Sequence, residues 1–448
     1  MVCDMFSKDS KEFRPWEKGC KAFILVLVVG LAIRLFFIPF TSSPFDVAAG
    51  WVAVVDGTYS GDTIYESGWY FYPPVWGYIL SILSGVADVI GMGSFGDVFP
   101  SIYEGQVLTI GHGMLTNMGF NILVKIPALI FDVLAGVVAY EIVKRLTGDQ
   151  KKAVIGFALW FLAPVVIMSS SILCMFDSIM MFLMMLSLLT FMDKRYFLTG
   201  MLLSMAFLTK VFAIVIVPVM IAYILSEYDL DLKKRMRNLL YAASGFILMC
   251  VIIYLPAIVM GEFQDSLWFF TSRESAYGGS FSWSPSFNNV FFYFPFLAVG
   301  YLAIFAYMLT RRENRERTFL WLMVLSIIPI FSLPFVAYTP TYGITILPAI
   351  LILYSFKGRV ALIPWVLLAV YAFHGIAHYW ETMFYPMAAY LDFLDVNSIV
   401  ESSGSRLFYS AVLFMMFTPG ISIFLIMLYY MLKQREVSLW TLIQRRSA

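Results

Sequence analysis

Charged residues are scarce in this 448-residue chain. Asp, Glu, Lys and Arg make up 13% of the sequence, whereas soluble domains carry about 25% charged residues. Hydrophobic residues account for 61%, and many apolar runs reach the ~20 residues needed to cross the hydrocarbon core of a bilayer. Backbone polar groups in lipid must be satisfied within helices or closed barrels, and no alternating strand pattern is present. The composition therefore predicts an all-α polytopic membrane protein.

Cysteine and net charge are also low. The four cysteines are scattered and none has CxxC spacing, which argues against a disulfide framework. A net charge of +1 gives no indication of a nucleic-acid partner. No small-residue cleavage site accompanies the first apolar run, so residues 22–40 are expected to be a retained anchor.

One long segment lacks cations entirely. Residues 41–118 contain seven Asp and Glu but no Lys or Arg, and the positive-inside rule places this segment outside the cytoplasm. The apolar run 75–91 could be taken for a span, but a crossing there would move every later cationic loop to the other side. We therefore expect 75–91 to form an interfacial or re-entrant helix. The cations that keep the N-terminus cytoplasmic are Lys8, Lys11, Arg14, Lys18 and Lys21.

This topology gives twelve spans with both termini in the cytoplasm. All but five of the 30 Lys and Arg residues then lie on the cytoplasmic side. The exceptions are Arg34, Lys125, Lys210, Arg273 and Arg406. The spans are predicted at 22–40, 120–143, 153–170, 176–192, 196–211, 212–226, 238–260, 290–310, 318–335, 343–356, 360–380 and 408–432.

The chain is expected to form a single integral membrane domain, 1–448. Within it we predict a catalytic helical module over 22–260, which includes the external loop 41–118. A C-terminal helical module over 261–448 carries the external loops 261–289 and 381–407.

Charges inside the membrane are functional candidates, because each costs about 2.5–3.5 kcal/mol at the bilayer centre on insertion scales. Lys125 lies about one turn into the second span, and Asp132 follows on the same helix face. Lys125 could contact a phosphate or snorkel, and Asp132 could contact substrate or bond to a neighbouring helix. Lys210 precedes a hairpin containing Pro218, where an anion site and snorkelling are the alternatives.

Polar residues at the external ends of other spans are further candidates. Arg273 is the lone cation of 261–289, and its fork of donors suits a phosphate, with a salt bridge inside the loop as the alternative. Asp177 could hold a sugar hydroxyl or act at a helix N-terminus. His374 and His378 have i,i+4 spacing, but HxxxH alone is a weak metal signal. Packing at the interface or a hydrogen bond to a lipid phosphate is favoured over a metal.

The acidic residues of the first external loop indicate a type of reaction. Residues 41–74 carry Asp46, Asp56, Asp62 and Glu66 among many aromatic residues. A carboxylate can remove a proton from an incoming hydroxyl while cations hold a phosphate leaving group. A large bundle is needed when one substrate resides in the bilayer. Asp46, directly after the first span, is the predicted catalytic base.

These motifs, in their order, resemble the GT-C superfamily of transferases that use a sugar linked to a polyprenyl phosphate. The nearest matches are the glucosyltransferases of the lipid-linked oligosaccharide pathway and the related mannosyltransferases. The resemblance covers roughly 20–300, and it departs from the family at Tyr70-Phe71, where the family has an Asp before Tyr-Pro-Pro. The motifs are Phe45-Asp46, Tyr72-Pro73-Pro74, Lys125…Asp132, Phe176-Asp177-Ser178, Thr209-Lys210…Pro218 and Arg273…Gly278-Gly279…Asn288.

The resemblance implies a GT-C-like bundle of about 12 transmembrane helices whose long first external loop contains interfacial helices. It also implies inverting transfer of a hexose, glucose or mannose, from a polyprenyl or dolichyl phosphate to a hydroxyl acceptor such as a lipid-linked glycan. The active site would face the external or lumenal side of a cell or ER membrane, with Asp46 as the base and without a metal or cofactor. The donor phosphate would be held by Lys210, Arg273, Lys125 and His378. Other substrate contacts would come from Asp177, Asp132, Tyr72, Glu66 and Asn288.

The main alternative is a polytopic transporter or flippase of a glycolipid or polar solute. Carriers of this size often show inverted repeats and helices broken at matching positions, and neither pattern is evident here. A ligase that moves a whole glycan from undecaprenyl phosphate and a non-catalytic assembly subunit are further alternatives. A carrier has little use for an external segment as long as 41–118 without a single cation.

Overall fold

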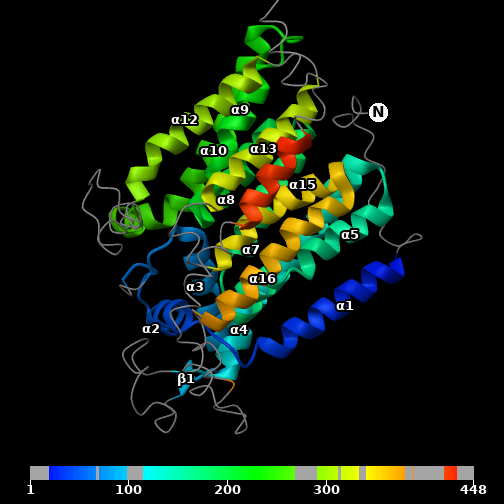
Figure 1. The fold of residues 1–448 in the computed structure, drawn as a ribbon. Coiled ribbons are helices and arrows are strands. Elements are labelled where there is room, and N and C mark those ends of the chain that lie inside the picture. Colours follow the sequence, from blue (N-terminus) through cyan, green and yellow to red (C-terminus); the bar gives the residue numbers. More distant parts are fainter. Residues whose placement is uncertain are drawn as a thin grey trace, which may run out of the picture.

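The computed structural model of the chain is a bundle of helices with a short two-stranded ribbon beside it. Figure 1 shows α2, α3 and the strand β1 gathered at one end of the bundle, and the connection between α4 and α5 at the other. The structure describes residues 20–66, 70–97, 115–267, 290–310, 314–331, 340–378, 387 and 418–430.

The first part of the chain builds the acidic loop between two long helices. After α1 (Cys20–Phe37), a π-helix (Pro44–Trp51) runs into α2 (Val52–Ser60), and α3 (Pro74–Val89) packs against α2. The strands β1 (Gly96–Asp97) and β2 (Leu115–Thr116) pair antiparallel, with Gly96 opposite Thr116.

The middle of the chain forms the centre of the bundle. The helices are α4 (Met118–Thr147), α5 (Gln150–Phe161), α6 (Pro164–Ile167) with its π-helical extension Met168–Ile172, and α7 (Asp177–Met192). They are followed by α8 (Tyr196–Thr209), a 3-10 turn (Val211–Ile216), α9 (Val217–Leu225) and α10 (Leu232–Met260).

The C-terminal part adds further helices to this centre. They are α12 (Val290–Leu309), α13 (Arg315–Phe331), a 3-10 turn (Pro340–Ile346), α15 (Leu347–Lys357), a second 3-10 turn (Gly358–Ala361), α16 (Leu362–His378) and a helix over Thr418–Tyr430.

Local sequence explains the ends of α4, the helix that carries Lys125 and Asp132. The Asn117 side chain accepts the Phe120 N–H at 2.8 Å and so caps the N-terminus. At the other end Gly148 adopts φ +66°, the left-handed conformation that suits glycine. Lys144 and Arg145 in the last turn complement the negative end of the helix dipole.

Burial separates the inner helices from those facing lipid. Almost every residue of α7 is buried, as expected for a helix that is apolar on all sides. The outer helix α10 instead exposes large apolar residues such as Leu240, Ile247 and Val259. Helices α8 and α10 approach closely at Gly200 and Gly245: a Cβ on Gly200 would lie 2.0 Å from the Ala242 carbonyl oxygen. Small residues permit such contacts between helices in membranes.

The all-α class is confirmed, whereas the number of spans is not. Among the described residues, three helices are long and apolar enough to cross a membrane: Met118–Thr147, Leu232–Met260 and Thr341–Ala372. The pair Gln150–Phe161 and Pro164–Ile172, bent by 44°, would make a fourth. The two spans predicted at 343–356 and 360–380 fall mostly within one continuous helical stretch, Thr341–Ala372.

The run predicted to be interfacial forms α3. Its 16 residues extend about 24 Å at 1.5 Å per residue, short of the ~30 Å hydrocarbon core. Ile82 and Val89 on this helix are largely exposed. An interfacial position for 75–91 therefore stays a prediction that the length of the helix supports.

Candidate active site

Asp46 lies in the first turn of the π-helix that follows α1. The Ser43 side chain caps this helix by accepting the Asp46 N–H at 3.1 Å, and Pro44 occupies its first position. The Tyr72 hydroxyl donates to Asp46 Oδ1 at 2.9 Å, and the Ser43 hydroxyl donates to Oδ2 at 3.3 Å. Asp46 is half-buried. A carboxylate in the first turn of a helix is stabilised by the helix dipole.

Lys210 interrupts the helical path between α8 and the next 3-10 turn. Its backbone is extended (φ −150°, ψ 136°), and the residue is only 4% exposed. The ammonium group lies 2.7 Å from Asp177 Oδ1, and both side chains are almost fully buried. The Ser169 hydroxyl is 3.5 Å from the other oxygen of Asp177.

Aromatic rings surround the Lys210 ammonium. Its nitrogen lies 4.6 Å from the ring centroid of Tyr342, 4.8 Å from that of Phe176 and 6.0 Å from that of Tyr72. Such rings attract cations through their negative faces. Tyr72 thus contacts both Lys210, through its ring, and Asp46, through its hydroxyl.

The structure therefore brings four predicted site residues together: Asp46, Tyr72, Asp177 and Lys210. We call these four the Asp46–Lys210 cluster. It combines a half-buried carboxylate with a buried cation, and Tyr72 contacts both. This arrangement can accept a proton at Asp46 and stabilise an anion near Lys210.

Sequence reasoning missed two aromatic residues that pack against this cluster. Tyr342 is supplied by the Pro340–Ile346 turn, far along the chain, and packs over Lys210. Trp51 donates to the Cys174 carbonyl at 3.1 Å and contacts the rings of Tyr72 and Phe176. The sequence shows many aromatic residues near the charged candidates, but it does not show which of these rings contact them.

Asp132 lies in a fully buried network. Its Oδ2 accepts hydrogen bonds from Arg34 Nε at 2.8 Å and from the Ser170 hydroxyl at 2.5 Å, while the Ser178 hydroxyl donates to Oδ1. Arg34 also donates to the Gly30 and Phe161 carbonyls. These bonds connect α1, α4, α5 and the segments around α7, which supports the helix-contact alternative. Substrate contact by Asp132 stays a prediction.

Lys125 is bonded to the turn that leads to Asp46. Its ammonium donates to the Ile38 carbonyl at 3.0 Å and to both oxygens of Thr41, with the Thr41 hydroxyl at 3.2 Å. Lys125 therefore holds the backbone between α1 and the π-helix. A phosphate contact by Lys125, as predicted, would require these acceptors to share the ammonium group.

The remaining predicted residues lie elsewhere. Glu66 is exposed and accepts the Thr63 N–H at 2.7 Å, and these Thr63 hydrogen bonds lower its pKa. No contact between Glu66 and the Asp46–Lys210 cluster is observed in the described part of the chain. Arg273 and Asn288 lie outside the described residues, as does the His378 side chain. The described residues include no group of three or more His, Cys, Asp or Glu suited to a metal ion.

Glu262, next to this loop, gives a pH-dependent prediction. Burial, and the charges of Glu66 and Asp265, raise the pKa of Glu262 above its usual value of 4.5. The folded protein therefore binds the proton of the Glu262 carboxyl more tightly than the unfolded chain does. The stability that protonated Glu262 contributes is present below about pH 4.5 and is lost as pH rises through the raised pKa. We expect the Tm of wild type to fall over this range relative to Glu262→Gln, measured by thermal unfolding in detergent. If the Tm of wild type and the Tm of Glu262→Gln changed equally with pH, Glu262 would not be the source of this pH dependence.

Comparison with known proteins identifies the fold and one family segment. The model of the family "Dolichyl-phosphate-mannose-protein mannosyltransferase" matches residues 109–255. A search of curated proteins gave no match. Among solved structures, the fold is similar to ArnT from Cupriavidus metallidurans bound to undecaprenyl phosphate, with a TM-score of 0.50 and 16% sequence identity. The similarity covers 91% of this chain and 76% of that one.

The family segment contains Lys125, Asp132, Asp177 and Lys210, and the similar fold extends over nearly the whole chain. The two comparisons together confirm the resemblance to the GT-C superfamily of polyprenyl-phosphate-sugar-dependent glycosyltransferases.

Proposed function

We propose that this protein is an inverting glycosyltransferase that moves a hexose, glucose or mannose, from a polyprenyl or dolichyl phosphate to a hydroxyl acceptor. The observation that carries the proposal is the Asp46–Lys210 cluster, in which Tyr72 contacts both a half-buried carboxylate and a buried ammonium. The matched family and the undecaprenyl phosphate bound to ArnT support this donor class. A lipid-linked glycan is the acceptor class we propose, on the external or lumenal side.

In the proposed reaction, Asp46 removes the proton from the acceptor hydroxyl. The acceptor oxygen attacks the anomeric carbon as the bond from that carbon to the phosphate oxygen breaks. The polyprenyl phosphate leaves with the bonding electrons, and the Lys210 ammonium stabilises its negative charge. Tyr72, hydrogen-bonded to Asp46, orients the carboxylate.

The Lys210–Asp177 pair sets the charge at this site. At 2.7 Å the two side chains balance each other in a buried environment, where an isolated charge is strongly disfavoured. A donor phosphate would be attracted to the same ammonium and would share it with Asp177. The surrounding rings of Phe176 and Tyr342 keep water away from this charge.

The test of this function is a donor panel. The purified protein is reconstituted in liposomes with radiolabelled polyprenyl-phosphate glucose and polyprenyl-phosphate mannose, and with a lipid-linked glycan acceptor. We expect a new glycosidic bond with one of these donors. Movement of the intact labelled lipid across the bilayer, with no new bond, would instead support a flippase.

Replacement of Lys210 by Met is expected to weaken use of the donor. Loss of one charge-assisted contact to phosphate is worth about 1.5–3 kcal/mol, so the donor kcat/KM should fall about tenfold or more. Kinetics at varied donor concentration provide the measurement. Lys194→Met is the matched control, because Lys194 pairs with Glu227 at 2.8 Å near an exposed helix end. Unchanged donor kinetics for Lys210→Met would refute the phosphate role.

A further inference from the structure

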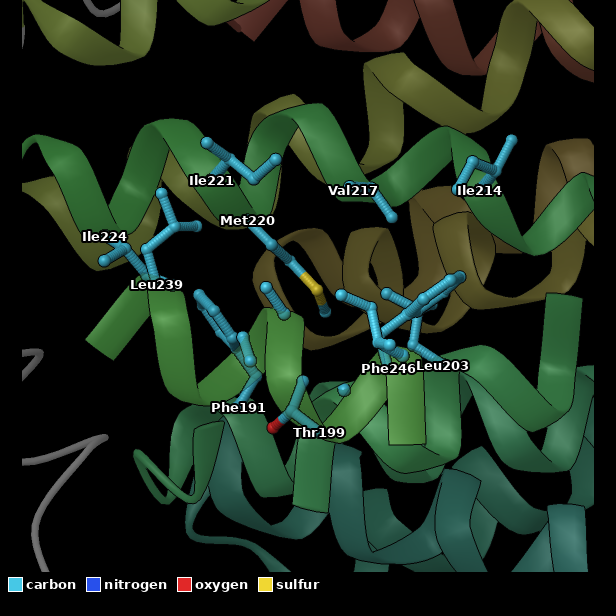
Figure 2. A pocket seen from close by; sticks show the side chains of 14 residues that line it. Phe191, Thr199, Leu203, Ile214, Val217, Met220, Ile221, Ile224, Leu239 and Phe246 are labelled. Atoms are coloured by element: carbon cyan, nitrogen blue, oxygen red, sulfur yellow. The ribbon is translucent and has the colours of Figure 1, made fainter. Parts of the chain in front are cut away.

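A second binding feature lies between α8, α9 and α10. It is an apolar cavity of about 230 Å³. Figure 2 shows Met220 of α9 pointing toward Leu203 of α8 and Phe246 of α10, with Ile224 and Leu239 beside each other at one end. Apolar cavities of about 150 Å³ already admit a benzene-sized molecule, so this cavity can hold a segment of hydrocarbon chain.

The lining presents no unmet polar group. Its one hydroxyl, on Thr199, donates to the Arg195 carbonyl at 3.1 Å and lies 3.0 Å from the Thr190 hydroxyl. Ile214 and Ile247, which also line the cavity, are 41% and 61% exposed. Because both side chains are exposed, the cavity reaches the outer surface of the bundle at these two residues.

The cavity is separate from the Asp46–Lys210 cluster. None of the cluster's four residues lines the cavity, whose near end, at Leu203 and Ile214, lies seven residues before and four residues after Lys210 in the sequence. Its far end, at Thr199, Ile224 and Leu239, is adjacent to the start of α8 and of α10.

That far end is bordered by positive charge. Arg195, Lys233, Lys234 and Arg237 are exposed, and in the part of the chain that the structure describes none of them makes an ion pair. Arg195 lies one turn before Thr199 on α8, and Lys234 lies in the first turn of α10.

Other charges face the same region. Arg235 is directed to the Leu225 carbonyl at 2.6 Å, and Lys194 is neutralised by Glu227 at 2.8 Å. Asp229 is exposed, and Asp231 caps α10 through the Lys234 N–H at 3.2 Å. Cations therefore predominate around the far end of the cavity.

We propose that this cavity and its basic border form a binding site for an anionic phospholipid, in the half of the membrane opposite the Asp46–Lys210 cluster. One acyl chain occupies the cavity, where it restores the dispersion contacts that an empty apolar space lacks. Its phosphate lies near Arg195 and Lys234. Basic groups beside transmembrane helices attract anionic lipid headgroups in this manner.

The test is native mass spectrometry of the full chain in detergent, titrated with phosphatidylglycerol or with phosphatidylcholine of the same acyl chains. We expect one phosphatidylglycerol to bind about tenfold more tightly than phosphatidylcholine, since each cation near the headgroup contributes to attraction. Equal retention of the two lipids would overturn the proposal.

Two variants test the two parts of the site. Ala243→Phe fills the cavity from an exposed lining position, and Ser244→Phe, on the next exposed residue outside the lining, is its control. Arg195→Gln with Lys234→Gln removes the basic border, and Lys151→Gln with Lys152→Gln, both exposed on α5, is the charge control. We expect each test variant, and neither control, to weaken phosphatidylglycerol binding about tenfold.

Intact binding in Ala243→Phe, with loss only in the charge variant, would show surface attraction without an acyl-chain site and would overturn the proposal. If Ala243→Phe fails to fold, Ala243→Leu provides the same test with a smaller side chain. Undecaprenyl phosphate is the third probe: its loss from Ala243→Phe, with phosphatidylglycerol retained, would assign the cavity to the polyprenyl chain instead. Sugar transfer by the same variants, measured separately, distinguishes failure of this site from failure of the proposed enzyme activity.

Discussion

Replacement of Asp46 by Asn is expected to lower the rate of sugar transfer by about 10²–10⁴-fold, the usual contribution of a general base. Asn keeps an oxygen that can accept the Tyr72 hydroxyl, now 2.9 Å from Asp46 Oδ1, but it cannot take the acceptor proton. Donor affinity should change little, because the positive charge that attracts phosphate is on Lys210. The measurement is kcat and donor KM with the sugar that the donor panel identifies.

Asp56→Asn is the matched control for this prediction. Asp56 lies in the same acidic loop, on α2, but its side chain is exposed, and transfer should be unaffected. Tm should also be equal in wild type and Asp46→Asn, because Asp46 is only half-buried. Full transfer activity in Asp46→Asn would end the assignment of Asp46 as the base.

Tyr72→Phe separates positioning from proton transfer. It removes the hydroxyl that donates to Asp46 and keeps the ring beside Lys210. A hydrogen bond to the ionised form stabilises that form, so without it the acidic limb of the kcat/KM–pH profile should move to higher pH. Lower activity with an unchanged profile would indicate that Tyr72 only packs in the site.

Composition was sufficient to predict the helical class, and the motifs included Asp46, Tyr72, Asp177 and Lys210 among a larger set of candidate site residues. Because the chain has few charged residues and long apolar runs, it is expected to lie in lipid, where helices satisfy the backbone hydrogen bonds internally. Asp46 follows the first predicted span, Tyr72 lies in the external loop 41–118, and Asp177 and Lys210 lie at the external ends of the predicted spans 176–192 and 196–211. If the topology places such positions at the same membrane face, they can meet even when they lie far apart in sequence.

Two features depended on geometry that spacing does not encode. Arg34 was recognised as a cation inside a span, but its pairing with Asp132 needs the rotation of α1 against α4, which apolar periodicity does not fix in a helix that is hydrophobic on most sides. The stretch Thr341–Ala372 was predicted as two spans, 343–356 and 360–380, with a break at 357–359. The chain continues there through a 3-10 turn, so the helical path is extended.

The buried pair Arg34–Asp132 gives the largest expected change in stability. Asp132→Asn leaves the Arg34 guanidinium, fully buried on α1, without its carboxylate at 2.8 Å, and loss of one partner of a buried pair costs about 3–5 kcal/mol. Arg34→Met should have a similar cost because Asp132 is then unpaired, whereas the double variant should recover much of the loss. Thermal unfolding of all four proteins in detergent measures the coupling between the two side chains. Lys194→Gln, which breaks a partly exposed pair, is the control and should cost at most about 1 kcal/mol. If Asp132→Asn keeps the wild-type Tm but loses sugar transfer, Asp132 contacts substrate and the network around Arg34 is not what holds α1 against α4.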